Sequence, residues 1–309
     1  MKLIKVLIDP SAPVLLTLHK GRDEFVQQIN HNYLAFYDNV KFIPYWLSDE
    51  ICKTVTGIGH TKRALYTDDD DVVYEHKHCV SLNGINVSLT EPDAMDRSIF
   101  IELEEIEDED RKKEEEILAR FESIKPKLLA YLFDVVAKAM QIKPTLRLTR
   151  LSRMADFTEW GEAISRALGY QDMLFVEAYN ENKNQQNLVA VNENLVASLL
   201  VKFWADYKTR NDAVYNGTPD QLYRELIQFA EENDIKITNQ QFPGASNILV
   251  KKLNAVRSNL KGGYGIIISI QRDQTNSSRI TIHDKTSSSP YLSLNHHYAL
   301  QILHKQILR

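Results

Sequence analysis

The stretch that decides the fold is residues 33–39, Tyr33-Leu34-Ala35-Phe36-Tyr37-Asp38-Asn39, in which five apolar or aromatic residues run directly into an acid and an amide. A continuous apolar run of this length is typical of a strand that is buried on both faces, as in parallel α/β sheets. Ligands bind at the carboxyl ends of the strands in such sheets, and Asp38 falls at that end. It is therefore a candidate for the magnesium side of a nucleotide-hydrolysing site. The alternative is a core strand that ends in an ordinary Asp-Asn turn.

Two further segments are expected to be strands of the same sheet. Residues 79–86 form a second apolar run that ends in polar side chains, and residues 99–103 form a third. Helices are expected at residues 1–8, 22–32 and 45–56, the last ended by Gly57. Strands separated by helices and turns indicate a parallel α/β sheet.

Residues 60–74 hold two β-prone pieces around a basic patch and the four aspartates 68–71. The aspartates could suggest a divalent-metal site, but they lack the alternating oxygen spacing and the glycine of a calcium loop. A solvated turn is the favoured interpretation, since charge runs are usually solvated.

Composition limits the classes of function. The 309 residues are 43% apolar and 26% charged with a net charge of −5, which indicates a globular protein whose nucleic-acid surface, if any, is local. Two cysteines, Cys52 and Cys79, are too few for a disulfide scaffold or a cysteine zinc site. We find no apolar run of membrane-spanning length and no signal peptide, and so expect a cytoplasmic protein with no membrane partner.

The middle third is predicted to be all-α. An acidic segment, residues 102–116, is interpreted as an exposed linker that runs into a helix. Residues 113–140 carry helical periodicity, and Pro126 is expected to split them into two helices. Further helices are expected at 153–168, 171–182 and 190–207.

The last third begins at residues 216–220, where Thr218 can cap a helix over 219–233. A second helix over 245–260 and two strands, 266–271 and 279–282, follow it. Helix, helix, hairpin is the order of a winged helix. Residues 216–309 hold 11 Lys or Arg against 7 Asp or Glu, so this part is positive although the whole chain is negative. Residues 284–309 are interpreted as a Ser-rich loop and a last helix.

Residues 1–215 resemble the ATPase domain of AAA+ or superfamily-three-like helicases, the primase-associated motors of phages, plasmids and integrated mobile elements. The strings that carry the resemblance occur in the family's order: Leu7-Ile8-Asp9-Pro10-Ser11, Phe36-Tyr37-Asp38-Asn39-Val40, Leu65-Tyr66-Thr67-Asp68-Asp69-Asp70, Leu82-Asn83-Gly84-Ile85-Asn86, Pro92-Asp93 with Asp96-Arg97-Ser98, and Arg153-Met154-Ala155-Asp156-Phe157 with Trp160-Gly161. The resemblance implies an incomplete AAA+ parallel-sheet core over 1–110, a helical lid over 111–215 and a winged-helix domain over 216–309.

The resemblance also implies roles for individual residues. Asp38 is similar to the Walker B acid that holds magnesium through water, and Asn39 stands where relatives carry a water-activating Glu, which an Asn cannot replace as a base. Asn83, or else Asn86, is similar to sensor 1. Arg97 is similar to an arginine finger, and the alternative is an ion pair with Asp96 or with the acidic segment. Arg153 is similar to sensor 2, and the alternative is an ion pair with Asp156.

In the family, a hairpin between Walker B and sensor 1 grips DNA in the pore, and Lys62 and Arg63 fit that place. An exposed basic turn is the alternative. The family's phosphate loop, Gly-x-x-x-x-Gly-Lys-Ser/Thr, would lie immediately before Met1 and is absent from the chain. We therefore expect a fragment of a longer gene, or half of a split motor, that does not bind ATP and Mg²⁺ tightly by itself.

Three hypotheses follow. The chain is a DNA-dependent ATPase fragment of a helicase, a homo-oligomer that is hexameric in the intact family. Alternatively, it is a non-catalytic DNA-binding or assembly module that acts through its winged helix. In the DNA-binding hypotheses, Lys251, Lys252 and Arg257 contact phosphates, and Arg272 and Arg279 lie on the wing. In the third, the winged helix serves protein contacts.

Overall fold

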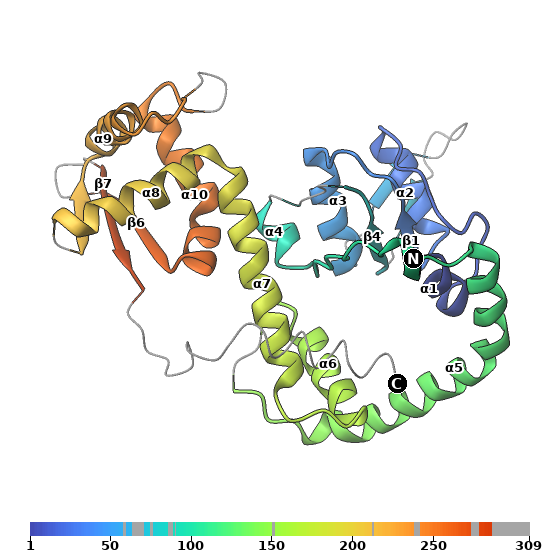
Figure 1. The fold of residues 1–309 in the computed structure, drawn as a ribbon. Helices are drawn as coiled ribbons and strands as arrows, with labels where there is room; N and C mark the ends of the chain where they lie inside the picture. Colours follow the sequence, from blue (N-terminus) through green and yellow to red (C-terminus); the bar gives the residue numbers. More distant parts are fainter. Residues whose placement is uncertain are drawn as a thin grey trace. The chain divides into compact units, whose positions relative to one another are not determined.

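The computed structural model describes residues 1–285 except 58–59, 64–70, 75–76, 86–88, 90, 150–151, 212, 238–241 and 273–277. The chain divides into two compact units, residues 1–176 and 177–309 (Figure 1). Among the described residues, the first unit combines helices with two two-stranded sheets, and the second combines helices with one three-stranded sheet, which confirms the expected mixture of α/β and helical parts. The predicted boundary between residues 215 and 216 falls inside the second unit.

The predicted central strand is present in the first unit. β1 (Leu34–Tyr37) pairs in parallel with β4 (Cys79–Leu82), with Leu34 opposite Cys79 and Tyr37 opposite Leu82. On its other side, β1 is joined by a single parallel bridge from Leu16 to Tyr37. The last three side chains of β1 are buried, whereas those of β4 are half-buried or exposed.

The third predicted strand, residues 99–103, does not form, so the sheet of β1 and β4 has two strands rather than three. Ile99, Ile101 and Leu103 are 48%, 79% and 79% exposed. Their apolar character favoured a strand, but a strand also needs a neighbour to receive its backbone hydrogen bonds. No described segment pairs with residues 99–103.

A buried lysine fixes the first helix, α1 (Lys2–Ile8), to the start of β1. The Lys5 side chain is 1% exposed, and its Nζ donates to Asp9 Oδ2 at 2.6 Å and to Asn32 Oδ1 at 2.9 Å. Asp9 Oδ2 also accepts from the backbone N of Leu34 at 2.8 Å. One carboxylate therefore neutralises the buried ammonium and holds the first residue of the strand.

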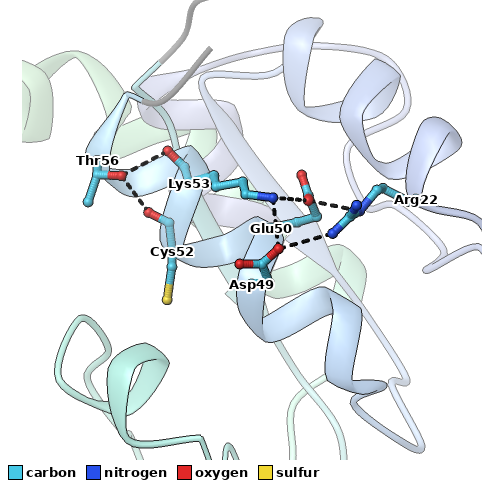
Figure 2. A network of polar contacts seen from close by, with 6 residues as sticks. All are labelled: Arg22, Asp49, Glu50, Cys52, Lys53 and Thr56. Atoms are coloured by element: carbon cyan, nitrogen blue, oxygen red, sulfur yellow. Dashed lines mark hydrogen bonds and ion pairs between the residues drawn. The ribbon is translucent and has the colours of Figure 1, made fainter. Parts of the chain in front are cut away.

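An ion-pair network joins α2 (Arg22–Asn30) to α3 (Tyr45–Thr56) (Figure 2). The Glu50 side chain is 3% exposed and lies 2.8 Å from Arg22 Nε and 3.0 Å from Lys53 Nζ. Asp49 contacts the same two cations at 3.0 and 2.7 Å. The helix α3 has the predicted bounds and ends at Gly57, whose φ of 80° is the left-handed conformation that glycine adopts without strain.

Between α3 and β4, the strands β2 (His60–Arg63) and β3 (Asp71–Tyr74) pair antiparallel, with His60 opposite Tyr74. This agrees with the two predicted β-prone pieces. Of the four aspartates 68–71, only Asp71 falls among the described residues. After β4 come the short helix α4 (Pro92–Met95) and the 3₁₀ turn η1 (Asp108–Asp110). All residues of the segment 101–110, which is rich in acidic side chains, are exposed, as the linker prediction requires.

The helical part of the first unit comprises α5 (Glu114–Ile142), the 3₁₀ turn η2 (Lys143–Thr145) and α6 (Ala155–Ala167). The prediction that Pro126 splits α5 is wrong, because the helix continues through it. Proline removes the bond to the carbonyl of Glu122, but both residues are exposed, so water can satisfy that carbonyl. Ala139, Leu146 and Ala163 form a small core between α5 and α6.

The second unit contains α7 (Leu174–Glu193), α8 (Leu195–Arg210), β5 (Val214–Gly217), α9 (Pro219–Glu232), α10 (Ser246–Gly263), β6 (Ile266–Arg272) and β7 (Ser278–Asp284). The strands form one antiparallel sheet in the order β5-β7-β6. Phe203 of α8, Leu226 of α9 and Leu253 of α10 share one buried core with the sheet. The helix α8 therefore packs with the last third of the chain, ahead of the predicted boundary.

The predicted capping box at the start of α9 is confirmed. Gln221 N donates to Thr218 Oγ1 at 3.2 Å, and Thr218 N donates to Gln221 Oε1 at 2.7 Å. The predicted helices at 171–182 and 190–207 are instead α7 and α8, which are separated only by Asn194. The predicted last helix in residues 284–309 lies outside the described residues from 286 onward.

Candidate functional site

The pair that the sequence singled out, Asp38 and Asn83, lies together at the carboxyl ends of neighbouring strands. Asp38 follows β1 and Asn83 follows β4, and the parallel register of these strands brings both residues to the same edge. Asn83 Nδ2 donates to Asp38 Oδ1 at 2.7 Å. Asn86, the alternative to Asn83, lies outside the described residues.

Asn39 has a structural reason to be an asparagine. Its φ of 53° is in the left-handed region, which Asn tolerates better than most residues. Its backbone N donates to Asp38 Oδ1 at 3.0 Å, so Asn39 and Asn83 both orient that carboxylate. The Asn39 side chain is exposed and lacks the basicity of a carboxylate.

We tested whether these groups fit a magnesium ion. Two donors bond Oδ1 of Asp38, whereas no described residue bonds Oδ2, and a carboxylate oxygen is a ligand that Mg²⁺ prefers. No three acidic, His or Cys side chains among the described residues are grouped to hold a metal. Among the described residues, Asp38 therefore offers one carboxylate oxygen to a cation, and any further ligands would have to come from outside these residues.

The start of α1 lies within electrostatic reach of Asp38. The pKa of Lys2 is raised by its hydrogen bond to Glu114 and by that carboxylate's charge, with a smaller contribution from Asp38. Lys2 Nζ is 2.7 Å from Glu114 Oε1, which ties α1 to the first residue of α5. No local pattern in the sequence links Lys2 with Asp38.

The two predicted arginines, Arg97 and Arg153, converge on one carboxylate. Arg97 Nη1 is 2.6 Å from Asp93 Oδ1, and Arg153 Nη2 also contacts that oxygen. Arg153 Nη1 lies 3.6 Å from Asp96 Oδ2. The sequence suggested Asp96 or the acidic segment as the alternative partner of Arg97, and Asp156 as that of Arg153. Asp93 was missed as the shared partner, although its i,i+4 spacing from Arg97 is a signal for an ion pair.

The thiol of Cys52 is a further hydrogen-bond partner of Asp93. Burial raises the pKa of Cys52 to about 12, and its hydrogen bond to Asp93 adds to the shift. The hydrogen bond from Arg97 lowers the pKa of Asp93, and the charge of Arg153 acts in the same direction. Asp93 is therefore an anion at neutral pH, and Cys52 is a protonated thiol.

The predicted DNA-contacting residues fall into two groups. Lys62 and Arg63 lie at the end of β2 in the β2–β3 hairpin, between β1 and β4 in sequence. In the second unit, Lys251 and Arg257 are exposed on α10, and Lys252 is half-buried there. Arg272 and Arg279 are exposed at the far end of the β6–β7 pair, where Arg272 lies opposite Ser278 and Arg279 opposite Gln271.

The charge of α10 is one-sided. The helix carries Lys251, Lys252, Arg257 and Lys261 and no acidic residue, whereas α9 carries Asp220, Glu225, Glu231 and Glu232 with one arginine. Neither Lys251 nor Arg257 forms an ion pair with a described residue. Lys251 and Arg257 are thus available to an anionic partner.

Two family models match the chain. One is described as "Actinomycete integrative conjugative element replication protein" and matches residues 2–185, and the other is described as "AICE RepA C-terminal domain" and matches residues 196–293. No curated protein and no solved structure matches the chain. The second match begins at the start of α8, which agrees with the packing of α8 in the second unit.

We also looked for helices that could cross a membrane. No single helix in the described part of the chain is long and apolar enough to do so. Only α7 and α8 taken together, bent by 98°, reach the required length and hydropathy.

Proposed function

We propose that this chain, which belongs to the family of actinomycete integrative conjugative element replication proteins, binds duplex DNA through its second unit. The observation that carries the proposal is the charge of α10, with four cations, no acid and an exposed outer face. Phosphate contacts from such a surface supply most of the affinity of DNA-binding proteins.

The topology of the second unit supports the same proposal. The order α8, β5, α9, α10, β6, β7, with the sheet order β5-β7-β6, supports a winged-helix assignment for this unit. In this arrangement α10 is the helix that enters the major groove, because DNA-reading helices dock there. Arg272 and Arg279 then lie on the wing, where they contact the backbone beside the groove.

The test is the affinity of the full chain for duplex DNA, measured by fluorescence anisotropy over a range of salt concentrations. We expect Lys251→Ala/Arg257→Ala to weaken binding by about tenfold or more at low salt and to reduce the salt slope by about 2, one unit for each lost phosphate contact. The matched control is Lys236→Ala, which removes an exposed cation of the same unit outside α10. Absence of duplex binding by the unaltered chain even at low salt would reject the proposal and favour a protein-contact role for the second unit.

A second candidate function concerns the first unit, and the hydrogen bond between Asp38 and Asn83 is the observation that favours it. We propose that this edge is the magnesium side of a nucleotide site related to AAA+ helicases, with Asp38 as the metal-side acid and Asn83 orienting water. Arg97 and Arg153 would then act on phosphates of bound nucleotide, Arg97 on that of a neighbouring subunit in an oligomer. Lys62 and Arg63 would contact DNA from their hairpin.

The sequence holds no Gly-x-x-x-x-Gly-Lys-Ser/Thr loop, so a second segment or polypeptide must supply the phosphate cradle. For the chain alone, we expect weak binding of magnesium–ATP and no useful hydrolysis. We expect Asp38→Ala to lower the magnesium-dependent part of that binding by about tenfold or more, since loss of metal-site groups has effects of that size. Titration calorimetry with and without Mg²⁺ measures this, and Asp134→Ala on the exposed face of α5 is the control. An affinity that Asp38→Ala leaves unchanged would contradict the assignment.

A further inference from the structure

The outermost ridge of α10 carries three uncharged hydrogen-bonding side chains and one lysine. Asn247, Asn254 and Ser258 are exposed and follow the spacing i, i+7 and i+11, with Lys251 at i+4. The opposite side of the helix is the core face, formed by Leu249, Leu253, Val256 and Leu260. Because residues three, four and seven apart share one face of a helix, the ridge points directly away from the core.

Cations lie on both sides of this ridge. Helical periodicity places Lys252 on one flank of α10 and Arg257 on the other. A helix that enters the major groove has a phosphate backbone along each flank, and its outermost ridge faces the base edges. The distribution of side chains on α10 matches this arrangement, with Lys252 and Arg257 at the flanks and the two amides beside Lys251 on the ridge.

The amides on the ridge differ from the other asparagine in the middle of this helix. Asn259 is 2% exposed, and its Nδ2 donates to Asn187 Oδ1 of α7 at 3.2 Å. Asn247 and Asn254 bond no described residue, so both ends of each amide are open to an outside partner. An Asn amide can bond the N6 and N7 atoms of adenine at the same time, a pairing that discriminates this base in the major groove.

We propose that Asn247 and Asn254 read adenine bases, so that the second unit binds DNA with sequence preference. The inference rests on the proposed duplex binding. Seven residues of helix rise about 10 Å, which equals about three base-pair steps of 3.4 Å. The two contacts therefore fall on adenines about three base pairs apart when α10 lies along the groove.

The experiment is selection of binding sites from a random duplex pool by the full chain, followed by affinity measurements on the selected duplex and on single-site A→G versions. We expect two adenine positions about three base pairs apart in the selected sites. Each A→G change is expected to weaken binding by the unaltered chain about 5- to 150-fold. Asn247→Ala and Asn254→Ala should each abolish discrimination at one position and retain it at the other.

Gln228→Ala is the matched control, because it removes an exposed amide from α9 in the same unit and should leave both preferences intact. Circular dichroism of each variant verifies that the fold is kept. Binding without base preference, or preferences that survive both Asn variants, would overturn the inference while leaving duplex binding in place. Failure to bind any duplex would overturn both proposals.

Discussion

Replacing Asp9 by alanine is expected to lower the free energy of unfolding by about 3–5 kcal/mol, the range for removing one partner of a buried ion pair. The variant leaves the ammonium of Lys5, which is 1% exposed, with only the Asn32 amide oxygen as acceptor. It also removes the acceptor of the Leu34 backbone N–H, which holds the start of β1. Urea unfolding followed by circular dichroism measures the change.

The control for this variant is Lys5→Met, which replaces the buried cation by an apolar side chain of similar length. It leaves Asp9 able to reach solvent, since that side chain is 23% exposed, and we expect a smaller loss than for Asp9→Ala. If Asp9→Ala lowers stability by less than about 1 kcal/mol, the anchoring role of this pair is refuted.

The same carboxylate gives stability a dependence on pH. Burial alone would raise the pKa of Asp9, but the hydrogen bonds from Leu34 and Lys5 and the charge of Lys5 lower it below 3.8. A pKa that is lower in the folded state means that the contribution is present above pH 3.8 and is lost as pH falls through the folded value. The Asp9→Ala variant should therefore show a flatter dependence of stability on pH in this acid range than the unaltered chain.

Replacing Trp204 by alanine is expected to lower the stability of the second unit by about 3–5 kcal/mol, the range for removing a large aromatic side chain from a core. Trp204 is 1% exposed, and its Nε1 donates to Asp284 Oδ1 of β7 at 2.7 Å. It stacks on Tyr207 with ring centroids 5.8 Å apart. A substitution in α8 therefore acts on the core that α9, α10 and the sheet share.

The control is Lys208→Ala, which removes the other partner of Asp284, at 2.8 Å. The Lys208 side chain is 34% exposed, so we expect a loss of about 0–1 kcal/mol. Thermal unfolding of both variants separates the two effects. If Trp204→Ala costs no more stability than Lys208→Ala, the expected contribution of Trp204 to this core is refuted.

The sequence predicted best the elements that have local chemical signals. The bounds of α3 followed from apolar periodicity and Gly57, and the start of α9 followed from the capping box of Thr218 and Gln221. Asp38 and Asn83 were each predicted to follow a strand of one parallel sheet, and the structure brings them into a hydrogen bond. Their role in chemistry stays a prediction.

What the sequence did not reveal depends on partners distant in the chain. The segment 99–103 has the apolar residues of a strand but no described neighbour to pair with. The strand β5 contains Asn216 and Gly217, which are typical turn residues, and yet it pairs with β7. The convergence of Arg153 and Arg97 on Asp93 depends on how α6 approaches α4. No spacing along the chain indicates such a tertiary contact.

The shared carboxylate of Asp93 makes the states of two distant arginines interdependent. Arg97 and Arg153 contact the same Oδ1 atom, so withdrawal of one leaves the other as the main partner of that charge. A group that binds Arg153 then changes the free energy of releasing Arg97 from Asp93. By thermodynamic reciprocity, a group that binds Arg97 changes the free energy of releasing Arg153 by the same amount. Arg153 precedes α6, and Arg97 follows α4. A movement of the helical part that carries Arg153 is therefore coupled to the release of Arg97 from Asp93.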